Sequence, residues 1–169
     1  MKNKELFEET IGVWISAFLD GTLAKGSCAA CAIGNLAAHA LGYKIDKEIL
    51  LGMFYDDYTA PWMTWRLSFC TSTDNGIQYS YPERHVTNSN VAKILNALKY
   101  PRKDLMKIEF AFETSTRIYF KKYSQHSEKE ILEDQFNGLM ACFTILEEIH
   151  EIEDTSYRES FKESLMVKL

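Results

Sequence analysis

The segment that most constrains the fold is residues 127–150, where a helix start signal precedes a long apolar run. Ser127 and Glu130 match a capping box, in which each side chain bonds the other residue's backbone N–H group. Apolar side chains then recur every three or four residues: Leu132, Phe136, Leu139, Phe143, Leu146 and Ile149. This spacing predicts a helix with one apolar face, the clearest in the chain.

Helical spacing recurs in other segments. We expect helices over 4–19, over 27–41, shortly after Asp46, from Asn88 or Ser89 to Pro101, over 104–123, and from Ser156 with Glu159 as its box acid. Asn3 and Gly21 suit the cap and stop of the first helix, as Ser27 and Gly42 suit those of the second. The sequence therefore predicts one mostly α-helical, compact domain of about six helices over residues 1–169, because 169 residues is a common size for one domain.

Residues 65–81 have a different pattern. Apolar and polar residues alternate from Trp65 to Thr71 and again from Ile77 to Tyr81, with Asp74-Asn75-Gly76 between them. Period-2 alternation around such a turn favours a β-hairpin, which would make the fold α+β in a minor part. A helix through Trp62, Trp65 and Phe69 is the competing interpretation.

The charge of the chain is negative overall and unevenly distributed. The net charge is −5, which disfavours binding to duplex nucleic acid through a basic surface. Residues 84–122 hold nine Lys or Arg against three acids, whereas residues 127–154 hold nine acids against Lys129. We expect the two stretches to complement each other within the fold.

The amino-terminal residues point to the cytoplasm. Acidic residues stand where a signal peptide needs an apolar run. The longest apolar stretch, residues 28–41, is too short to span a bilayer. We therefore expect a cytoplasmic protein without membrane contact, whose cysteines are reduced.

The most specific arrangement is a Cys28-x-x-Cys31 pair at the start of the second predicted helix. At about 100° per residue, Cys31 lies about −60°, Asn35 about −20° and His39 about +20° from Cys28. The four residues therefore share one narrow polar stripe, which we expect to be buried packing or the floor of a ligand pocket.

Two chemical interpretations of the cysteine pair lack their context. A helix N-terminus stabilises the thiolate form of a cysteine, which thiol redox chemistry uses. The thioredoxin-like motif also needs a strand before the helix, and none is predicted before this segment. A closed zinc site needs four ligands, and Cys28, Cys31 and His39 have no second Cys or His pair to complete them. Both remain weak alternatives.

Other motifs give little support to catalysis. Glu147-x-x-His150 is half of a carboxylate-bridged di-iron signature, and no second Glu-x-x-His occurs. The chain has no G-x-G-x-x-G, Walker or G-x-S-x-G motif. We therefore expect no cofactor, assign no catalytic residue and favour a binding protein over an enzyme.

The aromatic-rich middle segment holds the remaining candidates. Aromatic faces beside guanidinium groups can hold the base and phosphate of a small nucleotide. With the stripe residues, the predicted ligand-binding set is Asn35, His39, Trp62, Trp65, Arg66, Tyr79 and Arg84. The same rings would also serve as core.

Residues 27–42, Ser-Cys-Ala-Ala-Cys-Ala-Ile-Gly-Asn-Leu-Ala-Ala-His-Ala-Leu-Gly, resemble a segment of small uncharacterised phage and prophage proteins. Residues 108–116, 134–139 and 146–152 resemble the C-terminal half of those proteins. The resemblance implies a phage origin and carries no implication about catalysis. Its context suggests a counter-defence protein that sequesters a small, cyclic nucleotide signal, or an inhibitor that binds a host protein. Self-association into a homo-oligomer is left open.

Overall fold

The computed structural model describes residues 2–26, 30–45, 71–73, 76–78 and 96–169, and helices dominate them, which confirms the mostly α class. The elements are α1 (Lys4–Asp20), α2 (Ala32–Ala40), β1 (Thr71–Thr73), β2 (Gly76–Gln78), α7 (Arg102–Ser115), the 3₁₀ helix η2 (Phe120–Gln125), α8 (Glu128–His150) and α9 (Tyr157–Lys168). The helices predicted after Asp46 and from Asn88 or Ser89 lie wholly or mostly outside the described residues.

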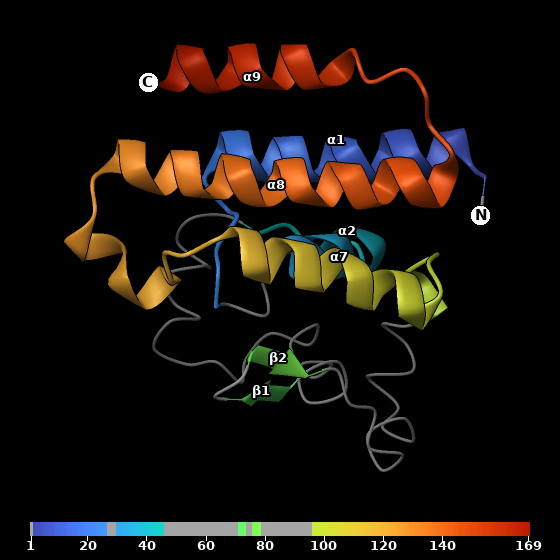
Figure 1. The fold of residues 1–169 in the computed structure, drawn as a ribbon, viewed down its shortest axis with the longest axis horizontal. Coiled ribbons are helices and arrows are strands. Elements are labelled where there is room, and N and C mark those ends of the chain that lie inside the picture. Colours follow the sequence, from blue (N-terminus) through green and yellow to red (C-terminus); the bar gives the residue numbers. More distant parts are fainter. Residues whose placement is uncertain (1, 27–29, 46–70, 74–75, 79–95) are drawn as a thin grey trace.

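The helices form three layers (Figure 1). Helices α1 and α8 run antiparallel in the middle layer, α9 covers one side of them, and α2 and α7 lie on the other side. Fully buried Trp14 joins two layers, because its Nε1–H donates to the carbonyl oxygen of Ala32 at 2.9 Å. The apolar core therefore runs through all three layers.

A short antiparallel pair supports the predicted hairpin. Strand β1 pairs with β2 in the register Thr71 to Gln78 and Thr73 to Gly76. The rest of the predicted hairpin, and the competing helix through Trp62, lie outside the described residues.

Local start and stop signals predicted three helix ends correctly. Asn3 caps α1, with its Oδ1 accepting the Leu6 N–H at 2.9 Å, and Gly21 ends that helix with φ of 71°. The capping box of α8 is complete, since Ser127 and Glu130 each bond the other's backbone N–H at 3.1 Å. These ends depend on neighbours in sequence, which is why the sequence shows them.

The predicted start of α2 was wrong. The helix begins at Ala32 instead of Ser27, with extended Cys31 as its N-cap, and the Cys31 Sγ accepts the Gly34 N–H at 3.4 Å. The preceding carbonyl groups are satisfied by a side chain, because Asn35 Nδ2 lies within 3.3 Å of the carbonyl oxygens of Thr22, Ala30 and Cys31. This amide therefore binds the backbone at Thr22, Ala30 and Cys31, ahead of the first helical residue.

The predicted extent of 104–123 was also wrong, because α7 ends at Ser115. The Lys25 ammonium donates to the carbonyl oxygens of Glu113 and Thr116 at the end of the helix. The Asp134 carboxylate accepts the backbone N–H groups of Arg117 and Ile118 at 2.8 and 2.9 Å. Side chains from distant segments thus replace the hydrogen bonds that would have continued the helix.

The same Asp134 contact shows how the two oppositely charged stretches meet. Helices α7 and α8 pack along each other. The acidic side chain reaches backbone amides of the basic stretch, whereas acidic Glu147 pairs with Arg158 at 2.6 Å. Complementarity between the stretches therefore runs in part through backbone dipoles.

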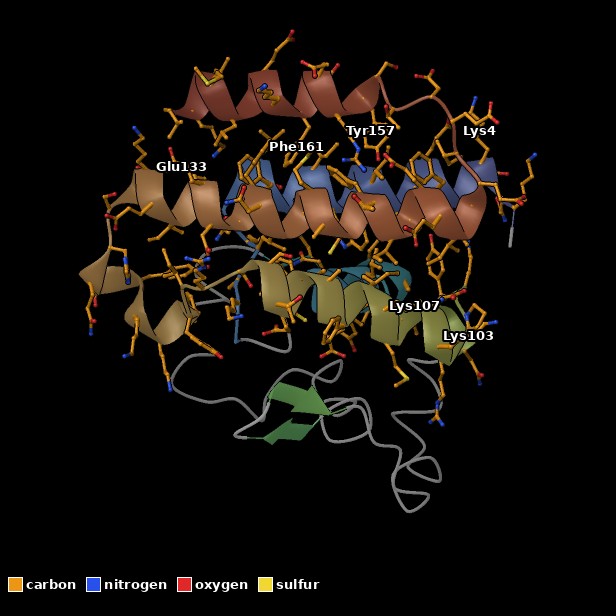
Figure 2. The ribbon with its side chains drawn as sticks, in the orientation of Figure 1. Lys4, Lys103, Lys107, Glu133, Tyr157 and Phe161 are labelled. Carbon is orange, nitrogen blue, oxygen red and sulfur yellow. The ribbon has the colours of Figure 1, made fainter. Side chains whose placement is uncertain are left out.

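Helix α9 is held by aromatic contacts. Tyr157 and Phe161 point from α9 towards the middle layer (Figure 2). The Phe161 ring stacks on Phe136 at 4.9 Å and meets the edges of Phe18 and Phe143 at 5.0 and 5.2 Å. Such ring pairs add to the area they bury, so Phe161 is the main anchor of α9.

The start of α9 differs from the predicted capping box. Ser156 is the N-cap, but its side chain makes no capping hydrogen bond. Its backbone N–H instead donates to Asp154 Oδ1 at 3.0 Å. Asp154 therefore replaces the predicted partnership of Ser156 with Glu159.

Candidate functional site

A small pocket of about 170 Å³ opens between α1, α2 and residues 97–100. Its walls are mainly apolar, and its lining consists of Leu6, Glu9, Thr10, Val13, Leu36, His39, Ala40, Ala97, Leu98, Lys99 and Tyr100. The volume is below the roughly 300–1,000 Å³ of pockets that enclose drug-sized ligands. The pocket therefore suits one ring or head group of a ligand whose remainder stays outside.

Three exposed charged or titratable side chains stand at this pocket. Glu9 Oε1 lies 3.2 Å from His39 Nε2, and Glu9 Oε2 lies 3.5 Å from Lys99 Nζ. Their side chains are 41% exposed for Glu9, 52% for His39 and 66% for Lys99, so water screens the pairs and they add little to stability. These groups can therefore exchange partners with a ligand at low cost.

A chain of hydrogen bonds, buried except at Asn3, runs behind the pocket. The Asn3 N–H donates to His150 Nδ1 at 3.3 Å, and His150 Nε2 lies 2.9 Å from the Tyr100 hydroxyl. That hydroxyl lies 2.7 Å from Thr10 Oγ1, and Thr10 Oγ1 donates to the Leu6 carbonyl oxygen at 2.8 Å. This chain of hydrogen bonds begins at the N-cap of α1, passes through the last residue of α8 and ends in the first turn of α1.

The direction of every bond in this chain follows from its ends. His150 Nδ1 accepts a hydrogen bond, so the neutral imidazole carries its proton on Nε2 and donates to Tyr100. Tyr100 has one hydroxyl proton and gives it to Thr10, whose own proton goes to Leu6. The polar groups are therefore all satisfied in a single consistent arrangement, as a buried network requires.

Burial fixes the protonation states that this arrangement needs. It lowers the pKa of His150 from the usual 6.5, because the cationic form is poorly solvated there. It raises the pKa of Tyr100 to about 12 for the same reason, since the anion would be desolvated. At neutral pH the imidazole is neutral and the phenol protonated.

The structure separates the residues that the sequence placed on one stripe. His39 lines the pocket, whereas Asn35 is buried and bonds the backbone of the preceding loop. Cys31 is buried at the N-cap of α2, and Cys28 lies outside the described residues. The Asn35 amide is thus engaged with backbone carbonyl groups, a different role from the predicted contact with a ligand.

The aromatic candidates cannot be placed. Trp62, Trp65, Arg66, Tyr79 and Arg84 all lie outside the described residues. Their predicted part in ligand binding stays a prediction.

The described residues hold no cluster of three or more His, Cys, Asp or Glu side chains able to bind a metal. The two residues of the half di-iron signature have separate partners. Both Glu147 carboxylate oxygens bond Arg158, at 2.7 and 2.6 Å, and His150 belongs to the chain behind the pocket. The arrangement explains this pair as two structural contacts.

Sequence reasoning missed Glu9, Thr10, Lys99 and Tyr100. Thr10 and Tyr100 are 90 positions apart, so no spacing rule relates them. The nearest signal is Thr10 itself, a polar residue close to the apolar face of the first helix.

Comparison with protein-family models, curated proteins and solved structures gave no match to this chain. Within the described part of the chain, no helix has the length and apolar character that crossing a bilayer requires.

Proposed function

We propose that this chain is a phage-type, non-enzymatic binding protein that sequesters a small nucleotide in the pocket between α1 and α2. The observation that carries the proposal is the lining of that pocket. Apolar walls from Leu6, Val13 and Leu36 offer a surface for a flat ring, and Lys99 stands at the same pocket as a cation for phosphate. The resemblance of residues 27–42 to phage proteins supports the phage origin.

Binding is favoured over catalysis by the protonation states at the pocket. A general acid or base works best with a pKa near the operating pH. The pKa of Tyr100 is about 12, and His150 is occupied on both ring nitrogens. Neither of these two groups is suited to exchange a proton with a ligand at neutral pH.

Mass spectrometry of the purified full-length chain tests this proposal. Under native conditions we expect a mass above that of the chain after incubation with nucleotides, and on denaturation we expect the intact nucleotide to be released. Recovery of a cleaved nucleotide would place the protein among enzymes. Absence of any nucleotide complex at millimolar concentration would contradict the proposal.

A matched pair of lysine variants locates the site. Lys99→Met keeps the aliphatic stem and removes the charge beside the pocket, and we expect up to about fivefold weaker nucleotide binding, since an exposed charge pair contributes up to about 1 kcal/mol. Lys107→Met is the control, because Lys107 is exposed on α7 and does not line the pocket (Figure 2). Equal loss in both variants would indicate non-specific attraction.

A protein partner is the second candidate function, in line with inhibition of a host enzyme. Met166 and Val167 favour it, because they are 67% and 87% exposed on the last turn of α9. A stoichiometric host protein captured by the wild-type chain and lost with Val167→Asp, in a sample that binds no nucleotide, would favour this function over the first.

A further inference from the structure

We infer that the pocket selects a ligand that donates hydrogen bonds, and that within the proposed nucleotide-binding function its ligand is an amino-bearing base, with the amino group directed inward and the phosphate outward. The inference rests on the proposed function and deepens it. It follows from counting the protons and lone pairs of the hydroxyl groups at the pocket.

The Tyr100 and Thr10 hydroxyls have no proton to offer. Each hydroxyl has one proton and two lone pairs. The Tyr100 proton goes to Thr10 and the Thr10 proton goes to Leu6, while Tyr100 accepts from His150 and Thr10 accepts from Tyr100. Each oxygen keeps one further lone pair, so any ligand atom that bonds Thr10 or Tyr100 must be a donor.

The direction of the hydrogen bonds from His150 through Tyr100 to Thr10 supports this preference for a ligand that donates. Reversing the Tyr100 hydroxyl would require His150 Nε2 to accept, and the imidazole proton would then move to Nδ1. Nδ1 already faces the backbone N–H of Asn3, at 3.3 Å. Two donors would then oppose each other at this partly buried end of the hydrogen-bond chain, and the cost falls on the His150 ring, which is fully buried.

Glu9 extends the same preference. Its carboxylate accepts only, and it stands at the pocket beside Thr10. The amino group of adenine, cytosine or guanine has two N–H donors, which match a pair of such acceptors. Because the pocket of about 170 Å³ has room for little more than the base, the sugar and phosphate stay outside, where Lys99 is 66% exposed. The buried hydroxyl acceptors of Thr10 and Tyr100 and the exposed cation of Lys99 thus favour one orientation of the ligand.

Calorimetric titration of the full-length chain with two ligand pairs tests the inference. The pairs are AMP with purine riboside 5′-monophosphate, and CMP with its analogue that lacks the 4-amino group. Within each pair the ring, sugar and phosphate are shared, and only the amino group is removed. We expect the amino-bearing member of at least one pair to bind at least about tenfold tighter, because the analogue leaves acceptors unpaired.

The outcomes separate the inference from the function on which it rests. Equal or tighter binding by the analogues, with measurable affinity for both members, overturns the inference and leaves nucleotide binding intact. Binding of neither member of either pair overturns both. Tyr100→Phe adds a second measurement, since it removes one acceptor, and we expect the preference for the amino-bearing member to fall several-fold while the phosphate contact at Lys99 is kept.

Discussion

Replacing Gly138 by alanine tests how closely α7 and α8 approach. A Cβ atom at Gly138 would overlap the Cγ2 methyl of Thr116 and come within 3.0 Å of two ring carbons of Phe112. Thr116 and Phe112 are both buried in the α7–α8 interface. Neither can move without disturbing the core, so we expect the added methyl to push the helices apart.

The destabilisation caused by Gly138→Ala is best measured against the same substitution at a second helical glycine. Alanine is favoured over glycine by about 1 kcal/mol inside any helix, and overpacking a core costs about 1–3 kcal/mol. Gly12, in the middle of α1, has nothing within 4 Å of an added Cβ. We therefore expect Gly12→Ala to stabilise the fold by up to about 1 kcal/mol and Gly138→Ala to be less stable than Gly12→Ala by about 1–3 kcal/mol.

Urea unfolding followed by far-ultraviolet circular dichroism measures both variants in the same host. Thr116→Ser provides the rescue, because it removes the overlapping methyl and keeps the hydroxyl that donates to the Phe112 carbonyl oxygen at 2.7 Å. The Gly138→Ala/Thr116→Ser double variant should be more stable than the sum of the single changes predicts. Equal stability of Gly12→Ala and Gly138→Ala, or strict additivity in the double variant, would refute the close approach.

Two further predictions concern buried titratable groups. The pKa of His150 is lowered in the folded state, so the contribution of His150 to stability is complete above pH 6.5. As the pH falls below 6.5, the unfolded chain binds a proton at His150 that the folded chain does not bind. The free energy of unfolding should therefore drop between pH 7 and 5, and a drop of the same size in His150→Gln would contradict this. Lys25→Met should cost about 3–5 kcal/mol, because it leaves the Glu113 carboxylate buried without its cation at 3.4 Å. Thermal unfolding checks that cost against exposed Lys107→Met, which should stay within about 0.5 kcal/mol of wild type.

Much of the fold could be predicted from the sequence, because several helix ends are local events. The Asn3 cap, the Gly21 stop and the box of Ser127 and Glu130 each involve residues a few positions apart. Of the two wrong helix ends, the end of α7 has distant causes. Helix α7 stops where Lys25 and Asp134 bind the backbone at its end. Neither residue lies within residues 104–123, whose apolar spacing predicted the helix.

The candidate site was harder to predict, for the same reason. His39 could be singled out because it shares a helical stripe with Asn35, and it does line the pocket. The partners that give the pocket its chemistry come from α1 and from residues 97–100, and helical periodicity says nothing about which helix faces which. The predicted stripe also depended on a helix that begins at Ser27. Because α2 begins at Ala32, Cys31 is its N-cap and does not lie on a helical face with Asn35 and His39.

The hydrogen bond between Asn3 and His150 also bears on how the chain is made. The two residues are 147 positions apart, so α1 leaves the ribosome long before its antiparallel partner α8 is complete. At about 5–20 residues per second, the interval is roughly 7–30 s. During synthesis the apolar face of α1, including Trp14 and Phe18, is therefore not yet packed against α8 for that interval. That interval is when a nascent-chain chaperone would have most to protect.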